Sequence, residues 1–376
     1  MPVSLSRRSF LAGLGVSAIS CGRQLASPYT GYLYVARKGQ RSVAVIDLAN
    51  FRWAGTVEFP APPSQLVRAG DAVFAVCPEI SAIVPMDVAS GKAGSPIRLP
   101  GSPSSILVHK DTNRAIVVSQ SASHAYRLDL KARRITARAQ FSAVPFGYDL
   151  SETSLAVALP GAQSVQFLDA TSLSTIRISA LGVSAETLRF RLDGQSVLLG
   201  AAKERQIATL HTASGKILSR LSIPISPERF CFNGDGGQMF VSGAGGDVVS
   251  IINPYQNEVD QTILAGGTPG AMVATERLSN GQPALLLVAN RDSGDVTMID
   301  IETRGLAASV HVGQQPGSVM VTPDQQFALT LNRLSGDVSV IRLKTVLDHK
   351  NKTKPLFTVV PVGAEPVSAV IMPRLT

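Results

Sequence analysis

A pattern of five residues recurs eight times along the chain, and six of the copies join a short apolar run to Asp or Asn, which favour turns. The fullest copies read Val, any residue, two apolar residues and Asp. The copies end at Asp47, Asp87, Asp129, Asp169, His211, Asn253, Asp300 and Arg342. The steps between them are 40, 42, 40, 42, 42, 47 and 42 residues. A period near forty residues in a strand-rich sequence is typical of a β-propeller, so we predict an all-β fold of this kind.

Each repeat contains four short segments of strand type, which are clearest between residues 266 and 312. One follows Pro269, and the others span 285–290, 296–300 and 306–312. Apolar and β-branched residues dominate these segments, whereas the gaps carry Asp, Asn, Ser, Gly and Pro, which favour turns. The repeat therefore predicts a four-stranded blade.

The Asp that ends the third segment has a physical role of its own. Its carboxylate can accept backbone N–H bonds from the tight turn that leads into the fourth strand. An amide oxygen can do the same, which explains Asn253 in this position. His211 and Arg342 are degenerate copies of the pattern.

A proline precedes the first strand in seven of the eight repeats, at positions 63, 103, 145, 227, 269, 316 and 366. Proline lacks an N–H group, so it is tolerated at a strand entrance that needs no ladder bond. The remaining repeat has Ala185 at this point. We expect a longer or altered crossover there.

The two ends of the chain predict how the ring closes. Residues 31–37 match the second strand of a repeat, and residues 365–372 match a first strand. We therefore expect one blade to be built from both termini, which pairs strand edges that would otherwise be exposed. Seven complete repeats and this split one give eight blades. Seven blades would require the repeat at 180–223, or the last one, to lie outside the ring.

Two segments carry a family resemblance. They read Leu287-Val-Ala-Asn290-Arg-Asp-Ser-Gly-Asp-Val-Thr-Met-Ile-Asp300 and Val312-Gly-Gln-Gln-Pro316-Gly-Ser-Val-Met-Val-Thr-Pro-Asp324. Both resemble the YVTN-type propeller repeat of bacterial and archaeal surface and periplasmic proteins. The resemblance covers residues 31–376 and weakens between 60 and 223. It implies a fold more than a chemistry, because such propellers include binding scaffolds, lactonases and redox domains that carry a cofactor.

The N-terminus resembles a twin-arginine export signal. Arg7 and Arg8 precede Ser9-Phe10-Leu11, and the mildly apolar stretch that ends at Ser20 is too short for a stable bilayer span of about 30 Å. An ordinary basic surface segment is the alternative. The sequence predicts a signal peptide over 1–20, a tether over 21–30 and a propeller over 31–376.

Cys21 stands at the predicted cleavage point. Ala18-Ile19-Ser20-Cys21 is an imperfect lipobox, because Ala replaces the usual Leu. Cleavage before Cys21 would let this residue be acylated and hold the protein at the membrane, in the periplasm or cell envelope. Read as a small-x-small site, the same segment would release a soluble protein.

Composition limits the kind of partner. The formal net charge is +8, and removal of residues 1–20, which contain Arg7, Arg8 and no acidic residue, lowers it to +6. Aromatic residues make up only 5% of the chain and do not alternate with basic clusters, so nucleic-acid binding is disfavoured. A basic periphery suits an anionic polymer or lipid. The ring pairs its own edges, so we expect a monomer.

Residues that could bind metals or act as nucleophiles are scattered. Cys77 and Cys231 fall in repeats on opposite sides of the ring, so we predict no disulfide between them. The five histidines, 109, 124, 211, 311 and 349, occupy different positions of the repeat. The sequence therefore assigns no metal site, no catalytic residue and no cofactor.

The predicted binding face is formed by the loops that follow the second and fourth strands, since these emerge on one side of a propeller. Loops held by a rigid scaffold commonly carry function. Seven basic residues of these loops would create an anion-attracting surface, although soluble exposed turns explain them as well. They are Arg37, Lys38, Arg41, Lys203, Arg205, Arg291 and Arg333. A basic insert at 347–354 is expected on the opposite face.

These features favour an exported, lipid-anchored binding propeller without catalytic activity. Its partner would be a protein or an anionic polymer of the cell envelope. One alternative is a lactonase acting on sugar lactones, which needs converging His, Arg and carboxylate groups. Another is a propeller with a haem-like redox cofactor, which export of folded proteins favours. The lack of a haem-attachment Cys-x-x-Cys-His motif disfavours it.

Overall fold

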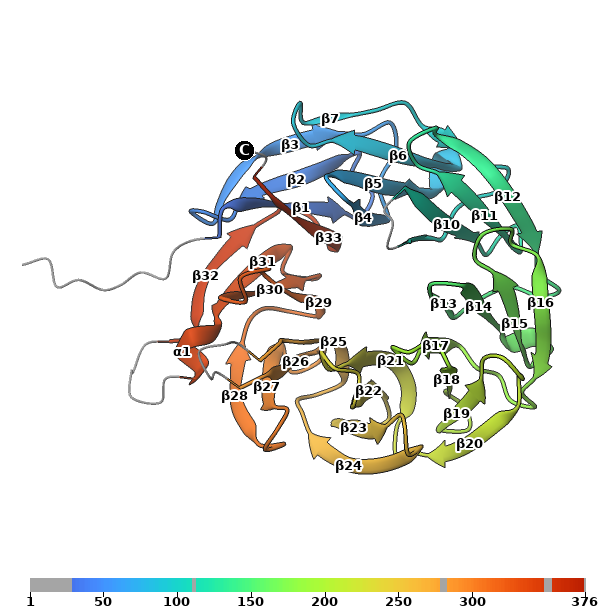
Figure 1. The fold of residues 1–376 in the computed structure, drawn as a ribbon. Helices are drawn as coiled ribbons and strands as arrows, with labels where there is room; N and C mark the ends of the chain where they lie inside the picture. The colour runs from blue at the N-terminus through green and yellow to red at the C-terminus, as the bar shows by residue number, and fades with distance from the viewer. Residues whose placement is uncertain (1–28, 110–112, 278–282, 348–353, 375–376) are drawn as a thin grey trace, which may run out of the picture.

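The chain folds into a ring of small antiparallel sheets around a central axis (Figure 1). The structure is a computed structural model and describes residues 29–109, 113–277, 283–347 and 354–374. Eight sheets follow one another around the ring in chain order. The prediction of an eight-bladed propeller is therefore confirmed, and no repeat lies outside the ring.

The first four blades run from an inner strand near the axis to an outer strand at the rim. The first blade contains β33 (Pro366–Pro373), β1 (Gly31–Arg37), β2 (Ser42–Asp47) and β3 (Arg52–Glu58). The second contains β4 (Gln65–Ala69), β5 (Ala72–Cys77), the 3-10 turn η1 (Pro78–Ile80), β6 (Ala82–Asp87), β7 (Lys92–Ala93) and β8 (Ile97–Arg98). The third contains β9 (Ser105–Val108), β10 (Arg114–Ser119), β11 (His124–Asp129) and β12 (Arg134–Gln140). The fourth contains β13 (Tyr148–Leu150), β14 (Ser154–Leu159), the 3-10 turn η2 (Pro160–Ala162), β15 (Ser164–Asp169) and β16 (Thr175–Ala180).

The last four blades repeat this order, and the described part of the chain has one short α-helix among them. The fifth blade contains β17 (Thr187–Phe190), β18 (Ser196–Ala201), β19 (Gln206–His211) and β20 (Ile217–Ser222). The sixth contains β21 (Ser226–Phe232), β22 (Met239–Ala244), β23 (Val248–Asn253) and β24 (Glu258–Leu264). The seventh contains β25 (Pro269–Ala274), β26 (Leu285–Asn290), β27 (Asp295–Asp300) and β28 (Leu306–His311). The eighth contains β29 (Pro316–Val321), β30 (Phe327–Asn332), β31 (Asp337–Arg342), α1 (Leu343–Leu347) and β32 (Leu356–Pro361).

The two ends of the chain close the ring as expected. β33 pairs antiparallel with β1 over a register that runs from Gly31 opposite Pro373 to Arg37 opposite Pro366. The C-terminal strand thus becomes the inner strand of the blade that the N-terminal segment begins (Figure 1). This pairing uses backbone groups that would otherwise form an open edge.

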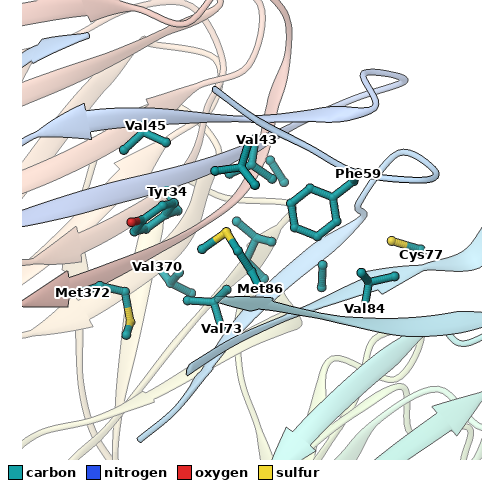
Figure 2. Close-up of a cluster of buried hydrophobic side chains, with 14 of the residues drawn as sticks. Tyr34, Val43, Val45, Phe59, Val73, Cys77, Val84, Met86, Val370 and Met372 are labelled. Carbon is teal, nitrogen blue, oxygen red and sulfur yellow. The ribbon is translucent and has the colours of Figure 1, made fainter. Parts of the chain in front are cut away.

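The hydrophobic core is divided among the junctions between neighbouring blades. Figure 2 shows one such cluster, in which side chains of the first and second blades point toward one another; among them are Tyr34, Val43, Phe59, Val73, Met86 and Val370. Successive side chains of a strand point to opposite faces, so each middle strand packs against both adjacent blades and is buried on both sides. Burial of apolar surface at about 25 cal/mol per Å² therefore holds the blades side by side.

Inner strands also join neighbouring blades by polar contacts. The backbone N–H of Leu66 donates to Ser368 Oγ of the first blade at 3.0 Å, and the N–H of Ile106 donates to Gln65 Oε1 at 3.1 Å. Such bonds satisfy inner-strand backbone groups that have no further strand to pair with. They fix how one blade sits against the next.

The turns after the third strands confirm the role expected of Asp. Asp47 Oδ1 accepts the N–H of Ala49 at 2.9 Å, and Asp300 Oδ1 accepts the N–H of Glu302 at the same distance. Asn253 accepts two N–H groups in the same way. Asp169 accepts bonds of the same kind, chiefly from Ser172, and they lower the pKa of its carboxyl group. The recurring Asp is thus a structural residue that closes each turn.

The crossover before Ala185 is regular, which corrects the expectation of a longer connection. Leu181 N–H donates to the carbonyl of Gln163 at 2.7 Å, and Phe141 N–H donates to Ser123 at 2.8 Å in the neighbouring crossover. The position that holds proline in the other repeats follows four residues after these donors: it is Pro145 after Phe141 and Ala185 after Leu181. Ala185 is buried, so a small apolar side chain fills the place of the proline ring.

The asparagines that end β26 and β30 are buried, and each organises its own hairpin. Asn332 donates from Nδ2 to Asp337 Oδ1 at 2.6 Å and to Ser339 Oγ at 2.9 Å. Asn290 makes the equivalent bonds in the seventh blade. Burial raises the pKa of Asp337, and the bond from Asn332 partly offsets this rise. In these two blades a buried Asn therefore ties the second strand to the third by side-chain hydrogen bonds.

Candidate functional site

The loop-rich face carries the hairpins between second and third strands together with the crossovers between blades. In each blade the crossover is tied to the hairpin of the blade it leaves. Phe59 N–H donates to the carbonyl of Arg41 at 2.7 Å, and Val362 N–H donates to Gly336 at 2.9 Å. Both kinds of loop thus lie at the same ends of their strands. All seven basic residues singled out from the sequence belong to this face.

Four of the seven come together where the ring closes. We call Arg37, Lys38, Arg41 and Arg333 the seam cluster. Lys38 Nζ lies 3.0 Å from Glu365 Oε2, and Arg333 Nε donates to Glu365 Oε1 at 2.8 Å. The eighth blade thereby meets both terminal strands of the first blade at one carboxylate. The pairing of the two terminal segments expected from the sequence brings Lys38 close to Glu365, whereas the contact with Arg333 of the eighth blade depends on how the blades face one another.

Arg37 also lies at this junction of the eighth and first blades, where it binds uncharged groups. Its guanidinium donates to the carbonyl of Val362 at 3.0 Å and to Ser42 Oγ at 2.5 Å. The guanidinium carbon also lies 5.7 Å from the ring centroid of Trp53. Arg37 is thus largely held by structural contacts, whereas Arg41 is exposed and makes no side-chain bond to any residue that the structure describes.

The seam cluster has more positive than negative charge. Glu365 is the carboxylate that contacts it, and hydrogen bonds from Lys38 and Arg333 lower the pKa of Glu365. The ion pairs therefore persist above that lowered pKa and are lost as the pH falls through it. Glu58, at the end of β3, is paired in register with Ser42, the residue that follows Arg41. Of the four cations, Lys38 and Arg333 thus share one carboxylate.

The other three predicted residues lie apart from the seam cluster. Arg291 pairs with Glu228 of the sixth blade at 3.1 Å. Arg205 donates to the carbonyl of Pro224 at 3.3 Å, and Lys203 is exposed in the same hairpin of the fifth blade. The face therefore has one concentrated basic region and two smaller ones.

A cleft of about 900 Å³ opens on the opposite face, which the sequence analysis did not single out. It lies between the fourth and fifth blades. The β13–β14 and β17–β18 hairpins form its sides, and the turn after β19 contributes Thr212. The residue after β9 of the third blade, His109, completes the wall. A volume of this size is within the usual range of ligand pockets, roughly 300–1,000 Å³.

Two of the carboxylates that line the cleft, Asp149 and Asp193, are compensated by neighbours. Asp149 Oδ1 lies 3.1 Å from Arg189 Nη1, while Asp149 Oδ2 accepts the N–H of Phe190 at 2.9 Å. Asp193 pairs with Arg191 at 2.7 Å. The bond from Arg191 is the main cause that lowers the pKa of Asp193. The guanidinium of Arg191 also stacks on Tyr255, 4.4 Å from the ring centroid.

Two of the five histidines, His109 and His211, line this cleft. His109 Nε2 lies 3.1 Å from the carbonyl oxygen of Glu152, and His211 Nδ1 lies 2.9 Å from Ser214 Oγ. They come from the third and fifth blades, on different strands of the repeat. Only the curvature of the ring brings them to one cleft.

Cys77 and Cys231 form no disulfide, as predicted. Cys77 and Cys231 are free, and burial raises the pKa of Cys77 to about 12. A thiol with such a pKa stays protonated and unreactive near neutral pH. Cys21, Arg7 and Arg8 lie outside the described residues, as does most of the basic insert.

Two further properties concern metals and membranes. In the described ranges, no three His, Cys, Asp or Glu side chains are grouped so that they could hold a metal ion. Those ranges also contain no helix with the length and apolar character needed to cross a bilayer.

Comparison with known proteins shows the fold. No protein-family profile and no curated protein sequence matches the chain. Among solved structures, the dihydro-heme d1 dehydrogenase NirN in complex with DHE is 15% identical, with a TM-score of 0.71 over 92% of this chain and 76% of that one. Apo AztD from Citrobacter koseri is 14% identical, with a TM-score of 0.64 over 91% and 98%.

A third solved structure covers less of the chain. Hydrazine synthase from Kuenenia stuttgartiensis is 17% identical, with a TM-score of 0.57 over 74% of this chain and 95% of that one. At such identities the likeness extends to the β-propeller fold. Function has to be argued from the site itself.

Proposed function

We propose that the protein is exported, is anchored through an acylated Cys21 and binds a protein or an anionic polymer of the cell envelope, without catalysing a reaction. The binding surface is the loop-rich face, centred on the seam cluster. Export and anchoring rest on the twin-arginine-like and lipobox-like segments of the sequence.

The seam cluster is the observation that carries this proposal. The side chains of Lys38 and Arg333 remain 66% and 46% exposed although both contact Glu365. Glu365 holds them in place from one side and leaves other donors of both groups open to solvent. Cations that are positioned in advance lose little side-chain entropy when an anion binds. Short loops tied by backbone bonds add to this rigidity.

The direction of β1 supports a partner other than the anchoring membrane. β1 begins at Gly31, where the predicted tether arrives, and ends at Arg37 in the seam cluster. Gly31 lies at the opposite face, because its carbonyl accepts the N–H of Leu48 in the turn after β2. Seven residues of strand span roughly 23 Å. The basic loops and the attachment point of the tether are therefore at opposite ends of a blade.

The residues of the cleft support neither lactone hydrolysis nor a haem-like redox cofactor as well as the seam cluster supports binding of an anion. Its Asp149 and Asp193 carboxylates are bound by arginines and backbone N–H groups, so neither is free to orient a histidine for lactone hydrolysis. A macrocycle such as the DHE of NirN would need a free histidine nitrogen. His109 contacts a backbone carbonyl through Nε2, whereas His211 contacts Ser214 through Nδ1 and keeps Nε2 open, so the two histidines do not present equivalent nitrogens to such a group.

A matched pair of charge-reversal variants tests the binding face. We expect Arg41→Glu with Lys203→Glu to weaken binding of labelled polyphosphate, a soluble anionic polymer, by about tenfold at low salt. Neither side chain makes an ion pair in the described part of the chain, so the fold should be kept. The full-length chain is titrated by fluorescence anisotropy at several salt concentrations.

The control is Lys92→Glu with Arg134→Glu, which changes the net charge equally on the opposite face. Both of its residues are exposed and lie beside turns after third strands. We expect the control to keep at least half of the original affinity. An equal loss of affinity in both double variants would mean that polyphosphate binding depends only on net charge, and the proposed binding face would be rejected.

A further inference from the structure

The cleft between the fourth and fifth blades has exposed apolar side chains on both sides. Ile176 of β16 is 54% exposed, and Leu192 of the β17–β18 hairpin is 58% exposed. Phe167 and Phe190 are buried in the wall behind them. Aliphatic groups held at a concave site gain free energy when a ligand removes them from water.

The electrostatics of the cleft favour an uncharged ligand. Asp149 is neutralised by Arg189, and Asp193 by Arg191. A charged ligand would have to compete with these pairs or lose its own hydration without a free counter-charge. A ligand without net charge avoids this cost.

Two polar groups of the wall remain without partners among the residues described. His211 uses Nδ1 toward Ser214, which leaves Nε2 unbonded. The hydroxyl of Thr212, the next residue, is buried and has no hydrogen-bond partner. Buried polar groups of native proteins are rarely left unsatisfied, so an unpaired hydroxyl beside a cleft calls for a partner. The polar side of the site therefore lies in the turn after β19.

We propose that this cleft is a second binding site, which takes an uncharged amphipathic molecule of small-ligand size. The apolar part of the molecule packs between Ile176 and Leu192, and its hydroxyl or carbonyl group hydrogen-bonds to His211 Nε2. The site lies on the face opposite the seam cluster, so it acts independently of the proposed polymer binding.

Nile red, an uncharged dye whose fluorescence rises in apolar surroundings, serves as the probe. We expect saturable binding at one site of the full-length protein. Ile176→Ser should weaken this binding about tenfold, because it removes most of the buried contact on one side. Ile178→Ser is the matched control: it lies on the same strand, is 55% exposed and is not part of the cleft. Its effect should stay below twofold.

The polar half of the site is tested by displacement of the dye. 2-Naphthol, which is neutral and carries a hydroxyl group, should displace Nile red about ten times better than 2-naphthalenesulfonate, which has the same rings and a negative charge. His211→Ala should reduce the advantage of 2-naphthol, whereas His311→Ala, outside the cleft, should leave it unchanged.

Three results would overturn the proposal. They are the absence of saturable dye binding, an equal loss in the Ile176 and Ile178 variants, and displacement by the sulfonate that is as good as displacement by 2-naphthol. The Arg41→Glu, Lys203→Glu variant should bind the dye normally. The outcome for the cleft is thus separate from the outcome for the loop-rich face.

Discussion

Replacement of Gly243 by alanine is expected to destabilise the protein by on the order of 4 kcal/mol or more. A Cβ atom at this position would lie 1.8 Å from the backbone oxygen of Ser226 and 2.9 Å from the backbone nitrogen of Glu228. Neither atom can move as a side chain does. β21 and β22 would have to separate, and their paired residues would lose hydrogen bonds and packing.

The position is special because other blades carry a side chain there. Gly243 pairs with Pro227, as Asn290 pairs with Pro269 and Asn332 with Pro316. In the sixth blade the strands approach more closely, so only glycine fits. Equilibrium urea unfolding, followed by circular dichroism, measures the effect.

Gly161→Ala is the control for this measurement. The nearest atom to a Cβ at Gly161 is the Cβ of Ala143, at 3.9 Å, which is ordinary contact. We expect a change within about 0.5 kcal/mol, or slight stabilisation through lower entropy of the unfolded chain. Equal stability of the Gly243→Ala variant and the original protein would show that the two strands are not packed as described.

Loss of export is the second large effect that we expect. In the full-length chain, Arg7→Lys combined with Arg8→Lys should leave nearly all of the protein in the cytoplasm, because a twin-arginine signal depends on both guanidinium groups. Arg23→Lys, which makes the same exchange just beyond the predicted cleavage point, should be exported normally. Cell fractionation and immunoblotting measure the distribution.

Cys21→Ala tests the anchor in the same fractions. We expect the protein to move from the membrane fraction to the soluble periplasmic fraction, since several acyl chains hold a protein firmly and their removal leaves no comparable attachment. Continued export of the double lysine variant would refute the twin-arginine assignment. An unchanged membrane fraction for Cys21→Ala would refute the lipid anchor.

Features with a local cause could be predicted from the sequence. The Asp turns depend on residues two or three positions apart, and the structure has the bonds that this spacing implies, as at Asp47 and Ala49. Strand order within a blade and the pairing of β1 with β33 follow from the repeat itself. Ala185 shows the limit of this reasoning, because the missing proline suggested an altered crossover although loop length was unchanged.

Features that depend on how blades face one another could not be predicted. His109 and His211 occupy different places in the repeat, in the third and fifth blades, and both line one cleft because of how the blades are arranged around the ring. The ion pair between Arg333 of the eighth blade and Glu365 of the first likewise joins two blades. Periodicity fixes the register inside a blade, whereas inter-blade contacts depend on twist and side-chain packing.

Ring closure by both termini is tested most directly by an engineered disulfide. Val35 and Ala369 are directly opposite in the pairing of β1 and β33, so Val35→Cys with Ala369→Cys should oxidise to a disulfide. In Val35→Cys with Val370→Cys the second side chain projects to the other face of the sheet, and no disulfide should form. Cys21→Ser removes the competing N-terminal thiol, and intact mass before and after thiol alkylation gives the result. A disulfide in the first pair alone is predicted, whereas its absence, or equal reaction of both pairs, would contradict the closed ring.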